Sequence, residues 1–282
     1  MPLQHVLGLD HVVVTTRNLD AAGATWRKLG FTLSPRGTHS PHIGSANYTI
    51  VFGDDYIELL GILTETPHNR LTTAFLKQRE GIERAAFTTD DAVAGLAELT
   101  ARGISGSGPL AFARPVELPG GGTTEARFNT FNWPAEDAPA GLRIFACQHL
   151  TPDAVWIPAL RHHPNGATRL AAVEIVAADP RAAAAQLSRL IDRPVESKGD
   201  GSYRVASGGN RADFLFHDAA AFARRYPEHV REGAPGEGAA ALSIATDDMA
   251  KARGIAGTVA HDGALSVPAA QASGVIVSFV DG

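Results

Sequence analysis

One short pattern occurs four times in this chain of 282 residues. Each copy begins with an apolar segment, continues through an Asp or Asn into an Ala-rich segment, and is followed by further apolar segments. The copies begin near residues 8, 81, 169 and 239. A repeat of roughly 70 to 90 residues is a supersecondary unit, which cannot bury its apolar face alone. The units must therefore pack against one another.

The first copy predicts a strand, a helix and three more strands. Residues 9–16 are apolar and β-branched, which favours a strand. Residues 20–29 carry apolar side chains at helical intervals, with Asn18 or Asp20 as the N-cap and Gly30 as the end. The three later strands are expected at residues 31–34, 46–52 and 56–60.

The other copies predict the same order of elements. The expected strands lie at 82–88, 111–118, 126–131, 142–148, up to Ala178, near Tyr203, near Phe214, at 241–245 and at 275–280, with helices at 92–102, 180–191 and from Asp247 or Asp248. Residues 219–238 stand apart as a helix followed by a linker.

One helix cannot cover both faces of a sheet, so two units placed edge to edge leave a curved sheet around a cup. We expect an α+β fold of four tandem βαβββ units, paired into two cup-shaped mixed sheets. The boundary near residue 160 separates an N-terminal domain (1–160) from a degenerate C-terminal half (161–282).

Composition excludes several classes of partner. The net charge is −5, and Lys and Arg form no tract longer than a pair, whereas affinity for nucleic acid comes largely from cations on phosphates. No apolar run approaches the roughly 20 residues of a membrane helix, and the N-terminus has no signal-like segment. The single cysteine, Cys147, rules out an intrachain disulfide and fits a reducing compartment. We expect a cytoplasmic protein with a small-molecule ligand, and a homodimer is left open.

Several short segments of the first copy carry a resemblance to a known family. They are Gly-Leu-Asp-His at 8–11, Leu-Gly-Phe-Thr at 29–32, the loop through Asn47, and the segment at 52–59 that ends in Tyr-Ile-Glu-Leu. Together with the tandem units, they resemble the glyoxalase-like proteins of the vicinal oxygen chelate superfamily. That superfamily includes glyoxalase I, extradiol dioxygenases, methylmalonyl-CoA epimerase and bleomycin-resistance proteins. The repeats cover most of the chain, but the motifs are specific only over residues 8–60.

The resemblance implies a divalent metal in the first cup. Metal ligands in this superfamily come from the first and fourth strands of paired units, positions that hold His11 and Glu58 here. Imidazole and carboxylate together suit Zn, Ni, Mn, Fe or Co. In the second unit the position equivalent to His11 is Arg84, and the one equivalent to Glu58 is near Phe145. Neither Arg nor Phe ligates metals. His149 is the candidate third ligand, and an inert histidine at a strand end is the alternative.

Three further residues are candidates for contact with a substrate. Arg84 suits a carboxylate or phosphate, although an ion pair with Glu83 is equally open. His39 lies in a loop expected at the mouth of the cup, with a solvated loop as the alternative. Asn47 is positioned to bind a ligand or to cap the backbone. Cys147 is expected to be a small buried apolar group rather than a nucleophile.

Two functions are compatible with these residues. The first is a metal-dependent lyase or isomerase acting on a small oxygen-rich substrate, with Glu58 as the catalytic base. The alternative is a metal-free binding or sequestering protein of the bleomycin-resistance type, with a cup lined by Phe128, Phe131, Trp133 and Phe145. In the second half Ala172 takes the place of His11, and Asp213 is assigned to the place of Glu58. The second cup is therefore expected to lack a metal.

Overall fold

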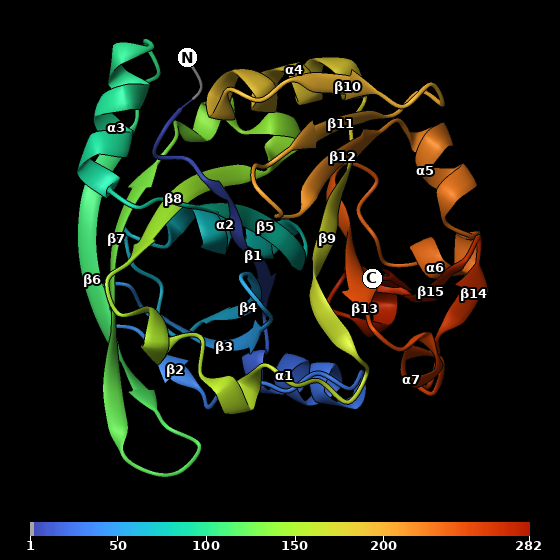
Figure 1. Ribbon diagram of the computed structural model, residues 1–282, viewed down its shortest axis with the longest axis horizontal. Coiled ribbons are helices and arrows are strands. Elements are labelled where there is room, and N and C mark those ends of the chain that lie inside the picture. The colour runs from blue at the N-terminus through green and yellow to red at the C-terminus, as the bar shows by residue number, and fades with distance from the viewer. Residues whose placement is uncertain (1–2) are drawn as a thin grey trace.

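The computed structural model describes residues 3–282 and consists of two eight-stranded mixed sheets with helices around them (Figure 1). The first sheet has the order β2-β3-β4-β1-β5-β8-β7-β6. Its strands are β1 (Gly8–Thr16), β2 (Gly37–Thr38), β3 (Ser45–Val51), β4 (Tyr56–Ile62), β5 (Gly81–Thr88), β6 (Ser107–Glu117), β7 (Thr123–Asn132) and β8 (Arg143–His149). Strand β1 pairs antiparallel with β5, so the two units of this sheet meet at its centre.

The second sheet repeats this order as β10-β11-β12-β9-β13-β16-β15-β14. Its strands are β9 (Ala167–Val176), β10 (Val195–Ser197), β11 (Tyr203–Ala206), β12 (Asp213–His217), β13 (Gly238–Thr246), β14 (Val259–His261), β15 (Ala264–Val267) and β16 (Ile276–Asp281). The expected α+β fold of paired units in two mixed sheets is confirmed. The first sheet ends at His149 and the second begins at Ala167, on either side of residue 160.

Helices lie within the units and in the connections between units. They are α1 (Leu19–Lys28), α2 (Arg70–Gln78), α3 (Ala92–Ala101), α4 (Pro180–Ile191), α5 (Ala219–Arg225), α6 (Glu228–Arg231) and α7 (Met249–Arg253). Short 3₁₀ turns occur at Ala135–Asp137, Pro139–Gly141, Pro152–Ala154, Pro158–Leu160 and Ala269–Gln271. Asn18 is the N-cap of α1, because its side chain accepts a hydrogen bond from the Ala21 amide at 3.0 Å. In the described part of the chain, no helix is long and apolar enough to cross a membrane.

Several local predictions differ from the structure, and strands β10, β14 and β15 were not expected. The expected strand at residues 31–34 is wrong: Phe31 and Leu33 are buried in the core, but pairing begins only at Gly37. Pro35 interrupts this segment, since proline has no amide to give to a neighbouring strand. Helix α2 was not predicted; Thr72 is its only buried residue, and Asn69 at its N-cap makes no side-chain capping hydrogen bond.

The two sheets share one hydrophobic core. Aromatic rings stack across the boundary between the halves: Phe87 on Phe214 with ring centres 5.7 Å apart, and Phe31 on Phe279 at 6.0 Å. The indole of Trp133 lies fully in this core and donates a hydrogen bond to the Leu190 carbonyl at 3.0 Å. Since one face of each sheet is buried against the other half, only the opposite face remains to form a cup.

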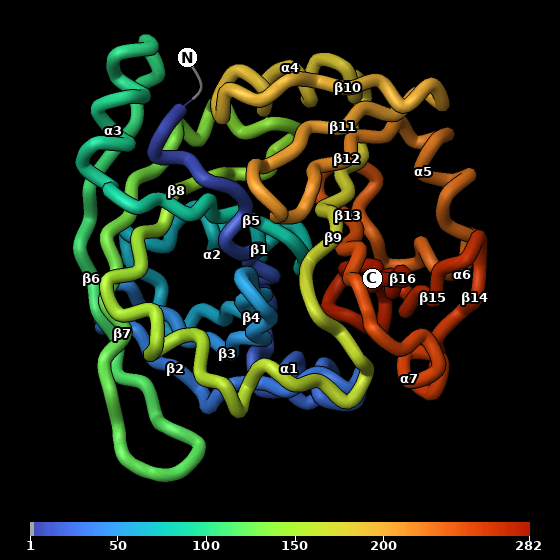
Figure 2. The backbone as a smooth tube through the Cα atoms, in the orientation of Figure 1, coloured from blue at the N-terminus to red at the C-terminus, as the bar shows by residue number. Residues whose placement is uncertain are grey.

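The first cup is partly closed by the connector between the halves. This connector, residues 150–166, runs past β2 and α1 before it enters β9 (Figure 2). Its apolar residues Val155, Ile157 and Leu160 pack in a second apolar cluster with Tyr56. The chain itself therefore forms part of the wall of the first cup.

Helices α5 and α6 pack into part of the second cup. Phe222 of α5, Tyr226 at its C-cap and Val230 of α6 pack against Val176 and Ile276 of the second sheet. The segment at 219–238, predicted as a helix and a linker, thus contains two short helices, and a cavity of about 520 Å³ remains beside Leu215, His217 and Tyr226.

A buried carboxylate holds the segment at 219–238 in place. Glu174 of β9 is fully buried and accepts two hydrogen bonds from Arg225, at 2.7 and 3.0 Å. The hydroxyls of Tyr226 and Ser243 each donate to it at 2.7 Å. Burial alone would raise the pKa of Glu174, but His217 and Arg225 outweigh it and lower the pKa to about 2.

Glu174→Gln is expected to remove an acid-dependent part of the stability. The pKa falls from an ordinary 4.5 to about 2 on folding, so this stabilisation is full above pH 4.5 and is lost as the pH falls toward 2. The shift corresponds to about 3 kcal/mol. Urea unfolding should show the wild type and the variant converging in free energy of unfolding as the pH falls from 7 to 3. Glu228→Gln, at an exposed position of α6, is the control. A gap that stays constant with pH would contradict this assignment.

Candidate functional site in the first cup

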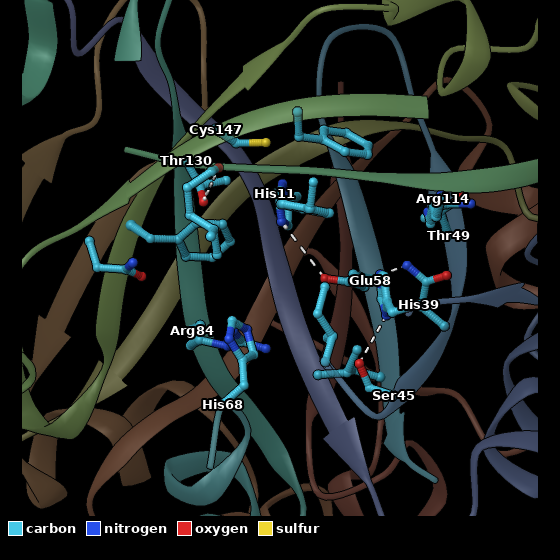
Figure 3. Close-up of a pocket in the computed structure, with 18 of the residues that line it drawn as sticks. His11, His39, Ser45, Thr49, Glu58, His68, Arg84, Arg114, Thr130 and Cys147 are labelled. Carbon is cyan, nitrogen blue, oxygen red and sulfur yellow. Dashed lines mark hydrogen bonds and ion pairs between the residues drawn. The ribbon is translucent and has the colours of Figure 1, made fainter. Parts of the chain in front are cut away.

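A cavity of about 130 Å³ lies in the first cup. Its wall comes from both units of the first sheet (Figure 3). The polar residues are His11, His39, Ser45, Asn47, Thr49, Tyr56, Glu58, His68, Arg84, Arg114, Thr130, Asn132 and Cys147, and the apolar ones are Ile43, Leu60, Leu110, Phe112, Phe128 and Phe145. The site is thus a pocket in which polar groups converge beside aromatic and aliphatic walls, which is typical of a small-molecule site.

His11 is held by a buried aspartate next to it in the sequence. Its Nδ1 lies 2.7 Å from Asp10 Oδ1, and its ring stacks on Tyr56 with centres 4.2 Å apart. Neighbouring residues of a strand normally point to opposite faces. Here the pairing of β1 with β5 shifts register between Leu9 and His11, so Asp10 is the extra residue of a β-bulge. The bulge brings both side chains to one site.

Asp10 is a centre of buried hydrogen bonds. Its Oδ1 also lies 3.0 Å from Nε2 of His149, and its Oδ2 accepts from the Thr88 hydroxyl at 2.9 Å. Burial would raise the pKa of Asp10, but His149 and His11 hold it well below its usual range. Because the carboxylate is ionised, it accepts hydrogen bonds, and we assign protons to His11 Nδ1 and His149 Nε2.

That nitrogen faces Glu58 across the cavity. His11 Nε2 lies 3.8 Å from Glu58 Oε2 (Figure 3). Asn47 donates to Glu58 Oε1 at 2.6 Å. Burial would raise the pKa of Glu58, but the nearby His11 and His39 outweigh burial and lower it. Arg84 and the Asn47 hydrogen bond act in the same direction. The cavity therefore presents a carboxylate and an imidazole nitrogen side by side.

The second unit contributes an arginine and an aromatic ring at the equivalent positions. Arg84 lies over Phe145, 5.7 Å from its ring centre, and both line the cavity. Its Nε is 3.2 Å from Glu83 Oε2, so the ion pair left open by the sequence is formed. Glu83 is again the extra residue of a bulge, since the register shifts between Val13 and Val14 of β1.

The structure brings most of the predicted site residues together. His11, Glu58, Arg84, Asn47 and His39 all line the cavity. His39 is part-buried, with its Nδ1 2.9 Å from the Ser45 hydroxyl, rather than in a solvated loop. Asn47 binds Glu58 and not the backbone.

His149 does not lie in the cavity wall. It contacts Asp10 and packs edge-on against Trp156 at 4.6 Å between ring centres. Asp10, Cys147 and His149 have potential metal-ligand atoms within 4.8 Å of one another, the one such group of three within residues 3–282. Cys147 is buried, which raises the pKa of its thiol well above the usual value.

Of the predicted aromatic lining, Phe128 and Phe145 face the cavity, whereas Phe131 and Trp133 belong to the shared core. Sequence reasoning missed Asp10, Tyr56 and Arg114. Arg114 could have been found, because it alternates with Leu110 and Phe112 along β6 and therefore shares their face.

The second cup differs from the first at both candidate ligand positions. Ala172 stands in the place of His11, as expected. Glu58 pairs with Val13 in β1, and the corresponding pair in the second half is Leu215 with Glu174. Leu215 therefore holds the place of Glu58, and the assignment of Asp213 to that place is wrong. Asp213 instead binds Arg204 at 2.7 Å.

Paired βαβββ units that curl into a cup, with His11 and Glu58 on its first and fourth strands, define a member of the vicinal oxygen chelate superfamily. A glyoxalase-like domain matches residues 9–191, and the chain belongs to this family. No curated protein sequence matches the chain at a significant level.

Solved structures share the fold at low sequence identity. A hypothetical protein from Staphylococcus aureus is similar with a TM-score of 0.71 and 12% identity, over 97% of this chain and 99% of that one. A mutant of 4-hydroxymandelate synthase from Streptomyces coelicolor gives 0.58 and 13%, over 99% and 92%. Methylmalonyl-CoA epimerase from Mycobacterium tuberculosis gives 0.39 and 19%, over 52% and 92%. These likenesses concern the fold alone.

Asp10→Ala is expected to lower the free energy of unfolding by about 3 kcal/mol or more, because it leaves several buried donors unpaired at about 1 to 3 kcal/mol each. Thr88→Val removes only one hydrogen bond to Asp10 and should cost about 1 kcal/mol. Urea unfolding at neutral pH measures both. Equal, small losses in the two variants would show that Asp10 does not organise the site.

Proposed function

We propose that the protein is a glyoxalase-like enzyme, a lyase or isomerase that moves a proton on a small oxygen-rich substrate in the first cup, with a divalent cation held by His11 and Glu58. The observation that carries this proposal is the Asp10–His11–Glu58 arrangement. Asp10 binds Nδ1 of His11 at 2.7 Å, and Nε2 faces Glu58 at 3.8 Å in the cavity wall.

The residues present fit such a cation. Metal-bound histidines usually donate their second ring N–H to a carboxylate, which fixes the tautomer and the ring orientation. Asp10 plays this part for His11. Imidazole and carboxylate suit Zn, Ni, Mn, Fe or Co. His149, a predicted ligand, is bound to Asp10, so in this proposal it supports the aspartate. When bound, the cation would supply Lewis-acid polarisation of a substrate oxygen.

In this proposal the side chains of the cavity have different chemical roles. Glu58 is the carboxylate positioned to take up a proton, and Asn47 fixes its orientation through Oε1. Arg84 stabilises negative charge that develops on the substrate, because its guanidinium lies in the wall with Phe145 beneath it. The aromatic lining and the connector exclude water from the proton that is moved.

A second candidate is a metal-free binding protein. The observation that favours it is the pair Arg84 and Phe145, which replaces any further ligands from the second unit. In this case the same cavity holds a ligand without turnover.

Elemental analysis of the purified protein separates the two functions. The wild type should hold a divalent metal near one ion per chain. His11→Ala and Glu58→Ala should each weaken binding by more than the roughly 10- to 100-fold that loss of a supporting residue costs. The control is His162→Ala, an exposed histidine of the connector. If the wild type takes up no divalent ion, even after incubation with each candidate metal, this result would contradict the metal-dependent proposal and favour the binding protein.

A further inference from the structure

Arg114 is a buried cation without a partner among the described residues. It lies on β6, its exposed fraction is 6%, and it lines the cavity. Among residues 3–282, its guanidinium makes no hydrogen bond and no ion pair. Burial accordingly lowers its pKa, and Glu58 and Tyr56 oppose this shift. An arginine is costly to bury unless something pairs with it.

The surrounding chain makes room for this guanidinium. β6 and β2 are the two edge strands of the first sheet and contact each other. A Cβ atom placed on Gly37 of β2 would lie 2.8 Å from Nη1 of Arg114. Any larger residue at Gly37 would therefore collide with the guanidinium, so the glycine leaves the space that Arg114 occupies.

The acidic side chain of the cavity is not available to neutralise Arg114. Among the described residues of the wall, Glu58 is the one carboxylate, and it is already engaged by Asn47 and faces His11. The second arginine of the wall, Arg84, has its own partner in Glu83. Arg114 is thus the guanidinium of this described wall that has no direct partner, and a bound anion would supply one.

The space next to Arg114 is apolar. Phe112, two residues away on the same face of β6, stacks on Phe128 with ring centres 5.0 Å apart and planes at 23°. Leu110 continues this surface along the strand. A ligand that reaches Arg114 from the cavity therefore places its remaining atoms against phenyl rings.

We propose that the first cup binds a small carboxylate, with its anionic group on Arg114 and its apolar body against Phe112 and Phe128. This inference rests on the proposed function for the choice of cavity, and it adds the chemical class of the substrate and the residue that selects it. A guanidinium suits a carboxylate because its planar N–H groups match two carboxylate oxygens.

Isothermal titration with benzoate and with its neutral isostere benzamide tests the proposal. The wild type should bind benzoate at least about 10-fold more tightly, the least expected for a hydrogen bond to a charged group. Arg114→Gln should abolish this preference and leave benzamide affinity unchanged, whereas Arg114→Lys should retain part of it. Thermal unfolding of each variant verifies that it is folded.

Arg127→Gln is the matched control, since Arg127 is exposed on the neighbouring strand β7 and pairs with Glu125; it should retain the full preference. Equal affinity for benzoate and benzamide in the wild type, or no binding of benzoate at millimolar concentration, would overturn the proposal. So would a preference that survives Arg114→Gln in folded protein. Inorganic phosphate that binds more tightly than benzoate would overturn the carboxylate assignment.

The same titration on His11→Ala separates this inference from the proposed function. A variant that has lost its metal but still prefers benzoate supports the carboxylate site independently of the metal. If the wild type holds no metal yet shows the preference, the proposed function fails and the carboxylate site stands. If the wild type holds metal but shows no preference for benzoate, the carboxylate site fails and the proposed function stands.

Discussion

The structure depends on one core that both halves share. Each half is a curved sheet, and neither sheet has enough helices to cover both of its faces. Phe87 stacks on Phe214, and Phe31 on Phe279, so one face of each sheet is buried by the other half. The opposite face of each sheet then curves into a cup. The side chains inside each cup decide whether it is a binding site or a structural element.

The repeat made the architecture predictable, because periodicity reports burial and burial is what the four units have in common. The order of strands and helices along each unit followed from local patterns, and Asn18 is one of the two predicted N-cap candidates. The error at residues 31–34 arose because buried Phe31 and Leu33 give the same pattern in an unpaired extended segment as in a strand. Apolar alternation shows that a residue is buried, and it does not show that its backbone is paired.

The site was harder to predict for a different reason. Strict alternation along β1 places Asp10 and His11 on opposite faces, and only a bulge brings them together. The register shifts at the same place in all four units. The bulged residue and its successor are Asp10-His11, Glu83-Arg84, Ala171-Ala172 and Ala240-Ala241. The same β-bulge thus holds an acidic and a basic residue in each unit of the first half, and two alanines in each unit of the second half. Arg114, in contrast, could have been predicted from the alternation of side chains along β6.

The helices in the second cup have a consequence for how the two halves respond to ligands. Arg225 and Tyr226 bind Glu174 inside that cup, and because they belong to the same chain their effective concentration is fixed. This contact contributes to the folding free energy whatever small molecules the solution holds, and it weakens as Glu174 is protonated. Arg114 in the first cup has no such internal partner among the described residues, so a ligand that pairs with it would add its binding free energy to the stability of that half.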